Sequence, residues 1–464
     1  MPPKTEFDPA RFAFKLTLGV IGLTSAFAIG LYSGYKQNGL FQAADFAKRS
    51  LITTFREAPD LVQSGPPVHF LQPSRKPGEG VTVNARPDDG RLILMTGFFD
   101  GGNALRLIRR DGTIVAEWPV SYTTLFPDPD YLNHPPTTDW NVDLHGAVID
   151  PDGSVVFNFE YSGAVKLSRC GDVLWKLREP THHSVERAES GGYWIAGQNF
   201  FVDDPERRFD PITRLSDGEP YGEALALHVS EDGQVLQRIS IPEMLFKNGL
   251  KPLLTAGGFS FVHGAHWEHE LVHLNKIAEL PTSYAAAFPE FEPGDLLLSM
   301  RMQNLLLVFD PDTQRVKWHQ TGPWQRQHDP EFNADGTITV FNNNTYKVDM
   351  LPGGRSDPAL PRVSNITRVD PRTGQTEVAY GQKPGQEMLS IIRGKQESMP
   401  GGGFLITEFE AGRAFEVDAD GRLVWEYLNR YDADRVLEIT EARSYPADYF
   451  SVTDWSCAEE TASR

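Results

Sequence analysis

The sequence predicts an all-β protein, a six-bladed β-propeller preceded by an N-terminal transmembrane helix. The first observation is a turn followed by an apolar strand, which recurs about every 50 to 60 residues. Six such turns are found, at Asp111-Gly112, Cys170-Gly171, Asp232-Gly233, Pro311-Asp312, Thr373-Gly374 and Asp420-Gly421. Between them lie further turns that lead into strands such as SVVFNF, DLLLSM and FLITEF. Repeated units of about four strands are typical of propeller blades.

Composition agrees with this fold class. The 464 residues include 41 glycines and 34 prolines, which favours many turns and short strands over long helices. Nine tryptophans and 28 phenylalanines are enough for a large core. The net charge of −19 argues against nucleic acid as a partner, because phosphate binding requires a basic face.

The second observation is a charge-free run at residues 16–35, LTLGVIGLTSAFAIGLYSGY, which is long enough to cross a bilayer as a helix. We interpret it as a membrane anchor with the propeller outside the cytoplasm, in the periplasm. The alternative is a signal peptide cleaved after Ala28, although the apolar run continues past that point. The expected organisation is a tail at 1–15, the anchor at 16–35, a juxtamembrane helix and linker at 36–80, and the propeller at 81–464. A gap of about 80 residues between two closing turns predicts an insertion around 242–291.

Polar residues recur at two phases of the repeat, and both phases are expected to face the central channel. Eight residues before a turn glycine stand Thr82, His145, His183, His328 and Arg393. His273 takes the corresponding place in the blade that carries the insertion. Seven residues after it stand Gly97, Glu160, Gln198, Arg301, Asn343 and Glu408. A strand with a purely structural role would carry mixed residue types at these positions. The pattern therefore predicts a ring of functional side chains around one axis.

The residue types in this ring suit transfer of an anionic group. A neutral imidazole is a competent nucleophile near neutral pH. Arg301 and the other histidines would stabilise the negative charge of the transferred group. Asp329 follows His328 directly and should point to the other side of the strand, where we expect a structural role. By the same alternation, His182 should pack between blades beside the channel residue His183.

Two further patterns have structural readings. Glu160 and Glu408 could form an acid–base pair, but ion pairing with Arg301 or Arg393 is the favoured use. Tryptophans recur on the closing strands and are expected to pack between blades; they are Trp118, Trp175, Trp318 and Trp425. Phe259, Phe261 and Trp267 in the insertion could shape a pocket for an aryl ring.

At these residues the chain resembles the bacterial arylsulfate sulfotransferases, a propeller family. The matching motifs are His145-Gly with DPDGSVVFNF, His182-His183, His273-Leu-Asn275 before GDLLLSMR, Gln327-His328-Asp329 with NADGTITVFNN, and GGGFLITEFEAGRAFEVDADGRLVWEY. The resemblance covers residues 81–428.

The resemblance implies ping-pong transfer of a sulfuryl group from an aryl sulfate donor to a phenolic acceptor. It assigns His328 as the nucleophile that becomes a sulfohistidine, and His183, His273 and Arg301 as ligands of the sulfuryl oxygens. The remaining polar ring residues and a motif asparagine are expected to contact substrate; they are His145, Asn275, Glu160, Gln198, Asn343 and Arg393. Neither a cofactor nor a metal is expected.

Two other functions stay open. The propeller could serve as a binding or scaffolding module without catalysis. It could also be a metal-dependent hydrolase or lyase, because His263, His266, His269 and His273 are spaced by three or four residues, as ligands on one helix face can be. The pairing of Cys170 with Cys457 and the oligomeric state are not determined by the sequence.

Overall fold

The structure is a computed structural model that describes residues 8–36, 38–41, 44, 47, 70–87, 89–132, 135–201, 221–255, 270–345 and 362–457. The chain divides into two compact units, Met1–Gly65 and Pro66–Arg464, which are described separately.

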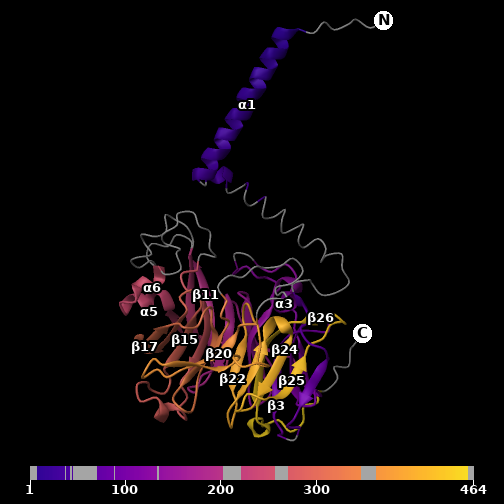
Figure 1. Cartoon of the computed structure of the whole chain (residues 1–464), viewed down its shortest axis with the longest axis vertical. Coiled ribbons are helices and arrows are strands. Elements are labelled where there is room, and N and C mark those ends of the chain that lie inside the picture. Colours follow the sequence, from indigo (N-terminus) through magenta and orange to yellow (C-terminus); the bar gives the residue numbers. More distant parts are fainter. Residues whose placement is uncertain are drawn as a thin grey trace. The chain divides into compact units, whose positions relative to one another are not determined.

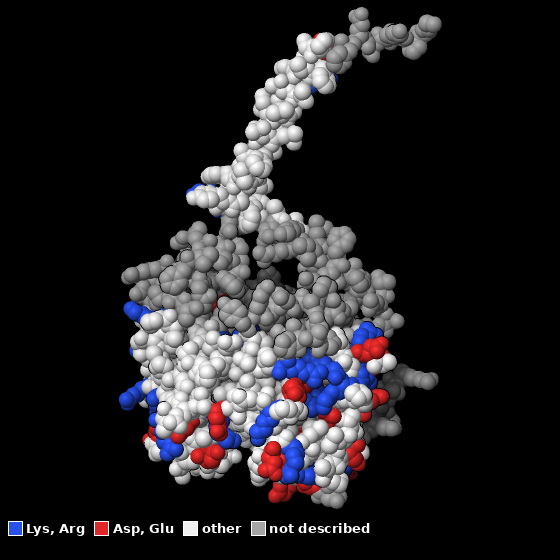
Figure 2. Space-filling model, viewed as in Figure 1, with Lys and Arg blue, Asp and Glu red and all other residues white. Residues whose placement is uncertain are grey.

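The described part of the first unit is dominated by one helix, α1 (Pro9–Lys36). Its 28 residues have a most apolar window of mean hydropathy 1.8, and that window buries nothing within the protein. About 20 apolar residues suffice to cross a bilayer, so the helix is long and apolar enough to do so. Residues 16–35 of this helix carry no charged side chain, and the face of the helix seen in Figure 2 is almost free of charge between its ends. The predicted span at 16–35 lies inside this helix.

The second unit is the predicted six-bladed β-propeller (Figure 1). Its first blade consists of β27 (Ile439–Tyr445), β3 (Leu92–Phe99), β4 (Gly102–Arg109) and β5 (Ile114–Pro119), in that spatial order. The second consists of β6 (Leu144–Ile149), β7 (Val155–Phe159), β8 (Gly163–Leu167) and β9 (Val173–Leu177). The third consists of β10 (Thr181–Arg187), β11 (Tyr193–Phe201), β12 (Tyr221–Val229) and β13 (Val235–Ser240).

The other three blades follow in chain order. The fourth consists of β14 (Leu274–Glu279), β15 (Leu296–Met300), β16 (Leu305–Asp310) and β17 (Arg315–Thr321). The fifth consists of β18 (His328–Phe332), β19 (Ile338–Asn342), β20 (Asn365–Val369) and β21 (Thr376–Tyr380). The sixth consists of β22 (Lys395–Ser398), β23 (Phe404–Glu408), β24 (Arg413–Val417), β25 (Leu423–Leu428) and an added outer strand, β2 (Gly80–Asn84).

The ring is closed by strands from both ends of the unit. The C-terminal strand β27 is the inner strand of the first blade, and β2 is the outermost strand of the sixth. Thr82, predicted to face the channel, therefore lies on an outer edge, where its hydroxyl donates to Glu426 at 2.6 Å. A small sheet of β1 (Leu71–Pro73) and β26 (Arg435–Leu437) accompanies this closure.

Short helices lie between the strands. They are α3 (Tyr122–Leu125), α5 (Ile241–Lys247), α6 (Lys251–Thr255), η2 (Asp139–Asn141), η4 (Ala285–Ala287), η5 (Phe409–Ala411) and η6 (Ala447–Tyr449). The segment between the third and fourth blades contains α5 and α6 and ends at β14. The inner strand of the fourth blade thus lies within the predicted insertion of 242–291, because that strand precedes the next turn glycine.

The core lies between blades. Clusters of buried apolar residues fill the six interfaces between neighbouring blades of the described ring. Trp118, Trp175 and Trp425 each reach from a closing strand to the next blade, where the indole N–H donates to the backbone oxygen of Ser168, Glu231 and Arg110, respectively. Trp318 packs against the cluster between the fourth and fifth blades. The predicted inter-blade role of these tryptophans is confirmed.

The pairing of the two cysteines, which the sequence left open, is resolved in the structure. Cys170, at the turn before β9, forms a disulfide with Cys457 in the C-terminal tail. Phe450 and Trp455, which precede Cys457 in the C-terminal tail, pack against the core between the first two blades. The disulfide thus fastens the end of the described chain to the second blade.

Candidate active site

A β-bulge near the start of the inner strand is the local feature that builds the site. Strand register shifts between Leu144 and Ala147 in β6, between Thr181 and Val185 in β10, and between Leu274 and Lys276 in β14. It also shifts between His328 and Glu331 in β18. A bulge bends a strand and re-aims its side chains. The predicted histidines stand in or next to these bulges.

Four histidines from four blades converge there. His183 is the centre, with ring centroids 4.1 Å from His145, 4.8 Å from His273 and 5.8 Å from His328. All four side chains are buried. Gly146 permits this approach, because a Cβ at that position would lie 2.3 Å from the backbone oxygen of His183. Two of the histidines are also joined directly, because the His183 backbone N–H donates to His145 Nδ1 at 3.1 Å.

His182 belongs to this cluster, contrary to the prediction that it packs between blades. His183 has a left-handed backbone conformation, with φ of 58°, inside the bulge of β10. The bulge removes the strict alternation of a strand, so consecutive side chains can reach the same site. The Nδ1 atoms of His182 and His183 are 2.7 Å apart, and the His182 ring stacks on Tyr161.

His328 is held in one tautomer. Asn343 donates through its amide nitrogen to the backbone oxygens of Ser390 and Arg393, at 2.9 and 2.8 Å. This fixes the amide with its oxygen toward His328, whose Nδ1 is 2.7 Å away. The oxygen can only accept, so His328 Nδ1 carries the proton and Nε2 carries a lone pair. Buried Nε2 has no hydrogen-bond partner among the described residues.

Burial keeps the cluster neutral. The pKa of His328 is well below its ordinary value because the ring is buried and, secondarily, because Arg301 is close. Burial also holds the pKa of His145 and of His183 well below the ordinary value, with Arg393 adding to the effect at His145. Burial lowers the pKa of His182 to about 3. At neutral pH these four rings are uncharged.

His273 has a buried carboxylate as its partner. The carboxylate of Glu270, three residues earlier, lies within hydrogen-bond distance of His273 Nδ1 and accepts from the Tyr161 hydroxyl at 2.9 Å and the Gln198 amide at 2.7 Å. Burial raises the pKa of Glu270, but His273, and after it His182 and Arg301, outweigh burial and leave the pKa at about 2. Sequence reasoning missed Glu270 and Tyr161. Two signals were available in the sequence. Glu270 lies three residues before His273, and Tyr161 directly follows Glu160, which stands at one of the two polar phases of the repeat.

Two arginines supply positive charge beside the histidines. The backbone N–H of Arg301 donates to the oxygen of His273 at 2.9 Å, and that of Arg326 donates to the Asn304 side chain at 2.8 Å. Within the described ranges, neither guanidinium has a hydrogen-bond or ion-pair partner. Burial and the charge of Arg301 lower the pKa of Arg326. Arg326, two residues before His328, was not predicted.

The other predicted substrate contacts are engaged in the protein. Asn275 donates to the backbone oxygen of Gln327 at 2.7 Å and so holds the residue before His328. Glu160 forms an ion pair with Arg393 at 2.9 Å, as expected, and Asp143 pairs with the same guanidinium. Glu408 differs from the expectation.

The Glu408 carboxylate was expected to pair with Arg301 or Arg393. It pairs with Arg75 and Arg413 instead, at 2.7 and 3.1 Å. Since Arg393 is neutralised by two carboxylates, Arg301 is the better suited of the two predicted arginines to meet an anion.

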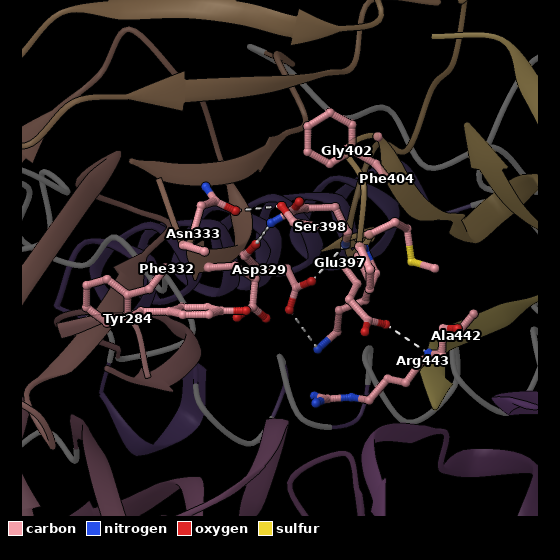
Figure 3. A pocket seen from close by; sticks show the side chains of 18 of the residues that line it. Tyr284, Asp329, Phe332, Asn333, Glu397, Ser398, Gly402, Phe404, Ala442 and Arg443 are labelled. Atoms are coloured by element: carbon pink, nitrogen blue, oxygen red, sulfur yellow. Dashed lines mark hydrogen bonds and ion pairs between the residues drawn. The ribbon is translucent and has the colours of Figure 1, made fainter. Parts of the chain in front are cut away.

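A cavity of about 620 Å³ lies farther along the same inner strands (Figure 3). An ionic network lines it. Lys276 contacts Asp329 at 2.9 Å and Glu331 at 2.7 Å, and Lys395 lies 3.5 Å from Asp329. Asp329 therefore points away from the histidines and neutralises lysines, consistent with the structural role expected from strand alternation.

Metal ligation was the third possibility raised by the sequence. Three of the four histidines concerned, His263, His266 and His269, lie outside the described residues. Over the described ranges, no group of three or more His, Cys, Asp or Glu side chains is arranged to hold a metal ion.

Fold and site together define a six-bladed propeller with a buried histidine cluster and a nearby arginine, Arg301, whose guanidinium has no hydrogen-bond or ion-pair partner among the described residues. The profile of the arylsulfotransferase (ASST) family matches residues 147–430. The chain therefore belongs to the arylsulfotransferase family.

Comparison with other proteins adds distant likenesses. A protein of unknown function from Bacteroides caccae is 13% identical, with a TM-score of 0.43, and the match covers 73% of this chain and 93% of that chain. Virginiamycin B lyase from Staphylococcus aureus is 11% identical, with a TM-score of 0.39, and the match covers 78% and 88%. These similarities are too distant to transfer a function. No match was found among curated proteins.

Proposed function

We propose that this protein moves a sulfuryl group from an aryl sulfate to a phenol by a ping-pong mechanism through a sulfohistidine on His328. The observation that carries the proposal is the state of His328 Nε2, a buried lone pair held by Asn343 beside the Arg301 charge. Family membership supports a sulfotransferase. The alternative of a binding module predicts no turnover.

In the first half-reaction, His328 Nε2 attacks the sulfur of the donor. The N–S bond forms, the S–O bond breaks, and its electron pair leaves with the phenolate oxygen. Negative charge on the sulfuryl oxygens meets the Arg301 guanidinium, which lies close to His328. Positioned donors in a water-poor site stabilise such charge strongly.

In the second half-reaction, the acceptor oxygen attacks the same sulfur and the electron pair of the N–S bond returns to Nε2. Sulfurylated His328 keeps its Nδ1 proton, because Asn343 Oδ1 still accepts it. The ring is then a cation bearing a sulfuryl group, which makes nitrogen a good leaving group. Asn343 thus supports both attack and release.

We also propose that α1 anchors the enzyme in a membrane with the propeller in the periplasm. The helix is of spanning length, and disulfides persist in oxidising compartments outside the cytoplasm. Donor and acceptor are small molecules that diffuse to the propeller.

Turnover of 4-nitrophenyl sulfate with phenol as acceptor tests the proposal. We expect wild-type protein to release nitrophenol and form phenyl sulfate, and His328→Ala to lose the activity. His319→Ala is the matched control, because His319 is exposed on β17, and it should retain wild-type rates. Equal activity of the His328 variant, or no turnover of several esters by wild type, would contradict the proposal.

A further inference from the structure

Four buried titratable groups follow one another in a chain of contacts. His182 Nδ1 is 2.7 Å from His183 Nδ1, and His183 Nε2 is 3.3 Å from His273 Nε2. His273 Nδ1 then contacts Glu270. Taken in the order of these contacts, from His182 to Glu270, the four side chains are 1%, 4%, 4% and 3% exposed. They touch directly, so water does not separate them.

When all three imidazole rings are neutral, the protons in this series of contacts can be placed in one way only. Each contact needs one proton, and each neutral imidazole supplies one. Ionised Glu270 can only accept, so the proton of His273 lies on Nδ1. His183 must then donate through Nε2, and His182 through Nδ1. This leaves a lone pair on His182 Nε2, a buried atom without a hydrogen-bond partner of normal geometry in the described part of the chain. The Gly197 backbone lies near this ring and favours its protonated form.

One added proton reverses the direction of the hydrogen bonds between the three imidazoles. A proton received at His182 Nε2 lets its Nδ1 proton pass to His183 and the His183 Nε2 proton pass to His273. The positive charge then rests on His273, beside the Glu270 carboxylate. Tyr161 and Gln198 donate to that carboxylate and hold it in place. The contacts thus lead from the buried acceptor atom His182 Nε2 to a site that stabilises a stored proton.

We propose that His182, His183, His273 and Glu270 form a proton relay that stores one proton between the two half-reactions. The inference rests on the proposed sulfuryl transfer and adds to it the path of the proton. His182, which the family resemblance gave no role, is the residue that exchanges the proton with the phenol oxygens.

The relay balances the cycle. When the acceptor attacks sulfohistidine, its O–S bond forms, the N–S bond breaks, and the phenolic proton passes to His182 Nε2 and on to His273. When the next donor is cleaved, that proton returns through the chain to the departing phenolate oxygen. No proton is gained or lost over one cycle.

The dependence of rate on the leaving group tests the relay. A phenolate derived from unsubstituted phenol, whose pKa is near that of tyrosine at about 10, needs a proton far more than nitrophenolate does. General acid catalysis typically contributes about 10²- to 10⁴-fold. Kinetic constants for sulfurylation would be measured with phenyl sulfate and 4-nitrophenyl sulfate.

Glu270→Gln removes the charge that stabilises the stored proton, and His182→Asn removes the exchanging atom. Both variants should lose about 10²-fold or more in kcat/KM with phenyl sulfate and much less with 4-nitrophenyl sulfate. His145→Asn is the matched control. The new amide oxygen can still accept the His183 N–H, and His145 is outside the chain of contacts, so any loss should be equal for both donors.

The possible outcomes are distinct. Equal losses with both donors in the Glu270 and His182 variants, each checked for folding by its melting temperature, would overturn the relay while leaving sulfuryl transfer intact. Should Glu270→Gln fail to fold, His182→Asn alone decides the matter. Absence of transfer from either donor by wild type would refute the proposed function itself.

Discussion

Replacement of Asn343 by leucine probes the orientation of the nucleophile. The change removes the acceptor of the His328 Nδ1 proton and the two donors to the Ser390 and Arg393 oxygens. Without the acceptor, His328 can move its proton to Nε2 or turn away, and either event removes the attacking lone pair. A buried polar group that loses its partner costs about 1–3 kcal/mol. We therefore expect kcat/KM per folded molecule to fall about 5- to 150-fold.

The same substitution should lower stability. The Arg393 oxygen loses its side-chain donor, whereas the Ser390 oxygen keeps a contact with the Ser364 hydroxyl at 3.3 Å. A loss of about 1–3 kcal/mol is expected. Asn365→Leu is the matched control, since Asn365 is also buried in the fifth blade but bonds to Asn342 and Thr367.

The assay is sulfuryl transfer from 4-nitrophenyl sulfate, corrected for the folded fraction by circular dichroism. Asn365→Leu should destabilise the protein with little effect on corrected activity. If Asn343→Leu retained wild-type activity per folded molecule, or if both variants lost activity equally, the tautomer argument would be refuted.

Three further predictions concern charge and covalent closure. Arg301→Gln should reduce kcat about 10²- to 10³-fold, and Arg301→Lys less, because removing a donor aimed at developing charge has costs of this size; an unchanged rate in steady-state assays would contradict the assigned role. Burial raises the pKa of Glu397 to about 7 from 4.5, so ionising it in the folded state costs stability as pH rises through that interval. Glu397→Gln should therefore stabilise the protein at pH 8 by up to about 3 kcal/mol and show no gain below about pH 4.5. The free energy of unfolding would be measured by chemical denaturation at both pH values, and a gain found only at acid pH would contradict the prediction. Replacing Cys170 and Cys457 by serine opens a loop spanning 287 residues, for which chain entropy gives a loss of roughly 5–6 kcal/mol; identical denaturation midpoints for the variant and the oxidised wild type would count against the disulfide.

The repeat made most of the fold predictable, because a turn followed by a closing strand has a local signature in every blade. Its limits were topological. Thr82 matched the inner-strand phase, yet the inner strand of the first blade comes from β27 at the other end of the unit. Local sequence does not reveal which terminal strand closes a ring. The cysteine pair was unreadable for the same reason, since its partners meet only after closure.

The histidine ring was predictable because it is fixed by the repeat, whereas its partners depend on bulges and loops. His182 was placed on the wrong side because strand alternation fails in the bulge of β10. Glu270 reaches His273 from the segment before β14, where no repeat position exists to mark it. Arg326 likewise lies on the connection before β18, outside both polar phases.

The most direct measurement is peptide mass spectrometry after brief mixing of the protein with 4-nitrophenyl sulfate and no acceptor. The account predicts an added sulfuryl mass on the peptide that contains His328, lost on addition of phenol and never formed in His328→Ala. A sulfuryl group on another residue, or nitrophenol release with no protein adduct under conditions that preserve sulfohistidine, would contradict the central claim.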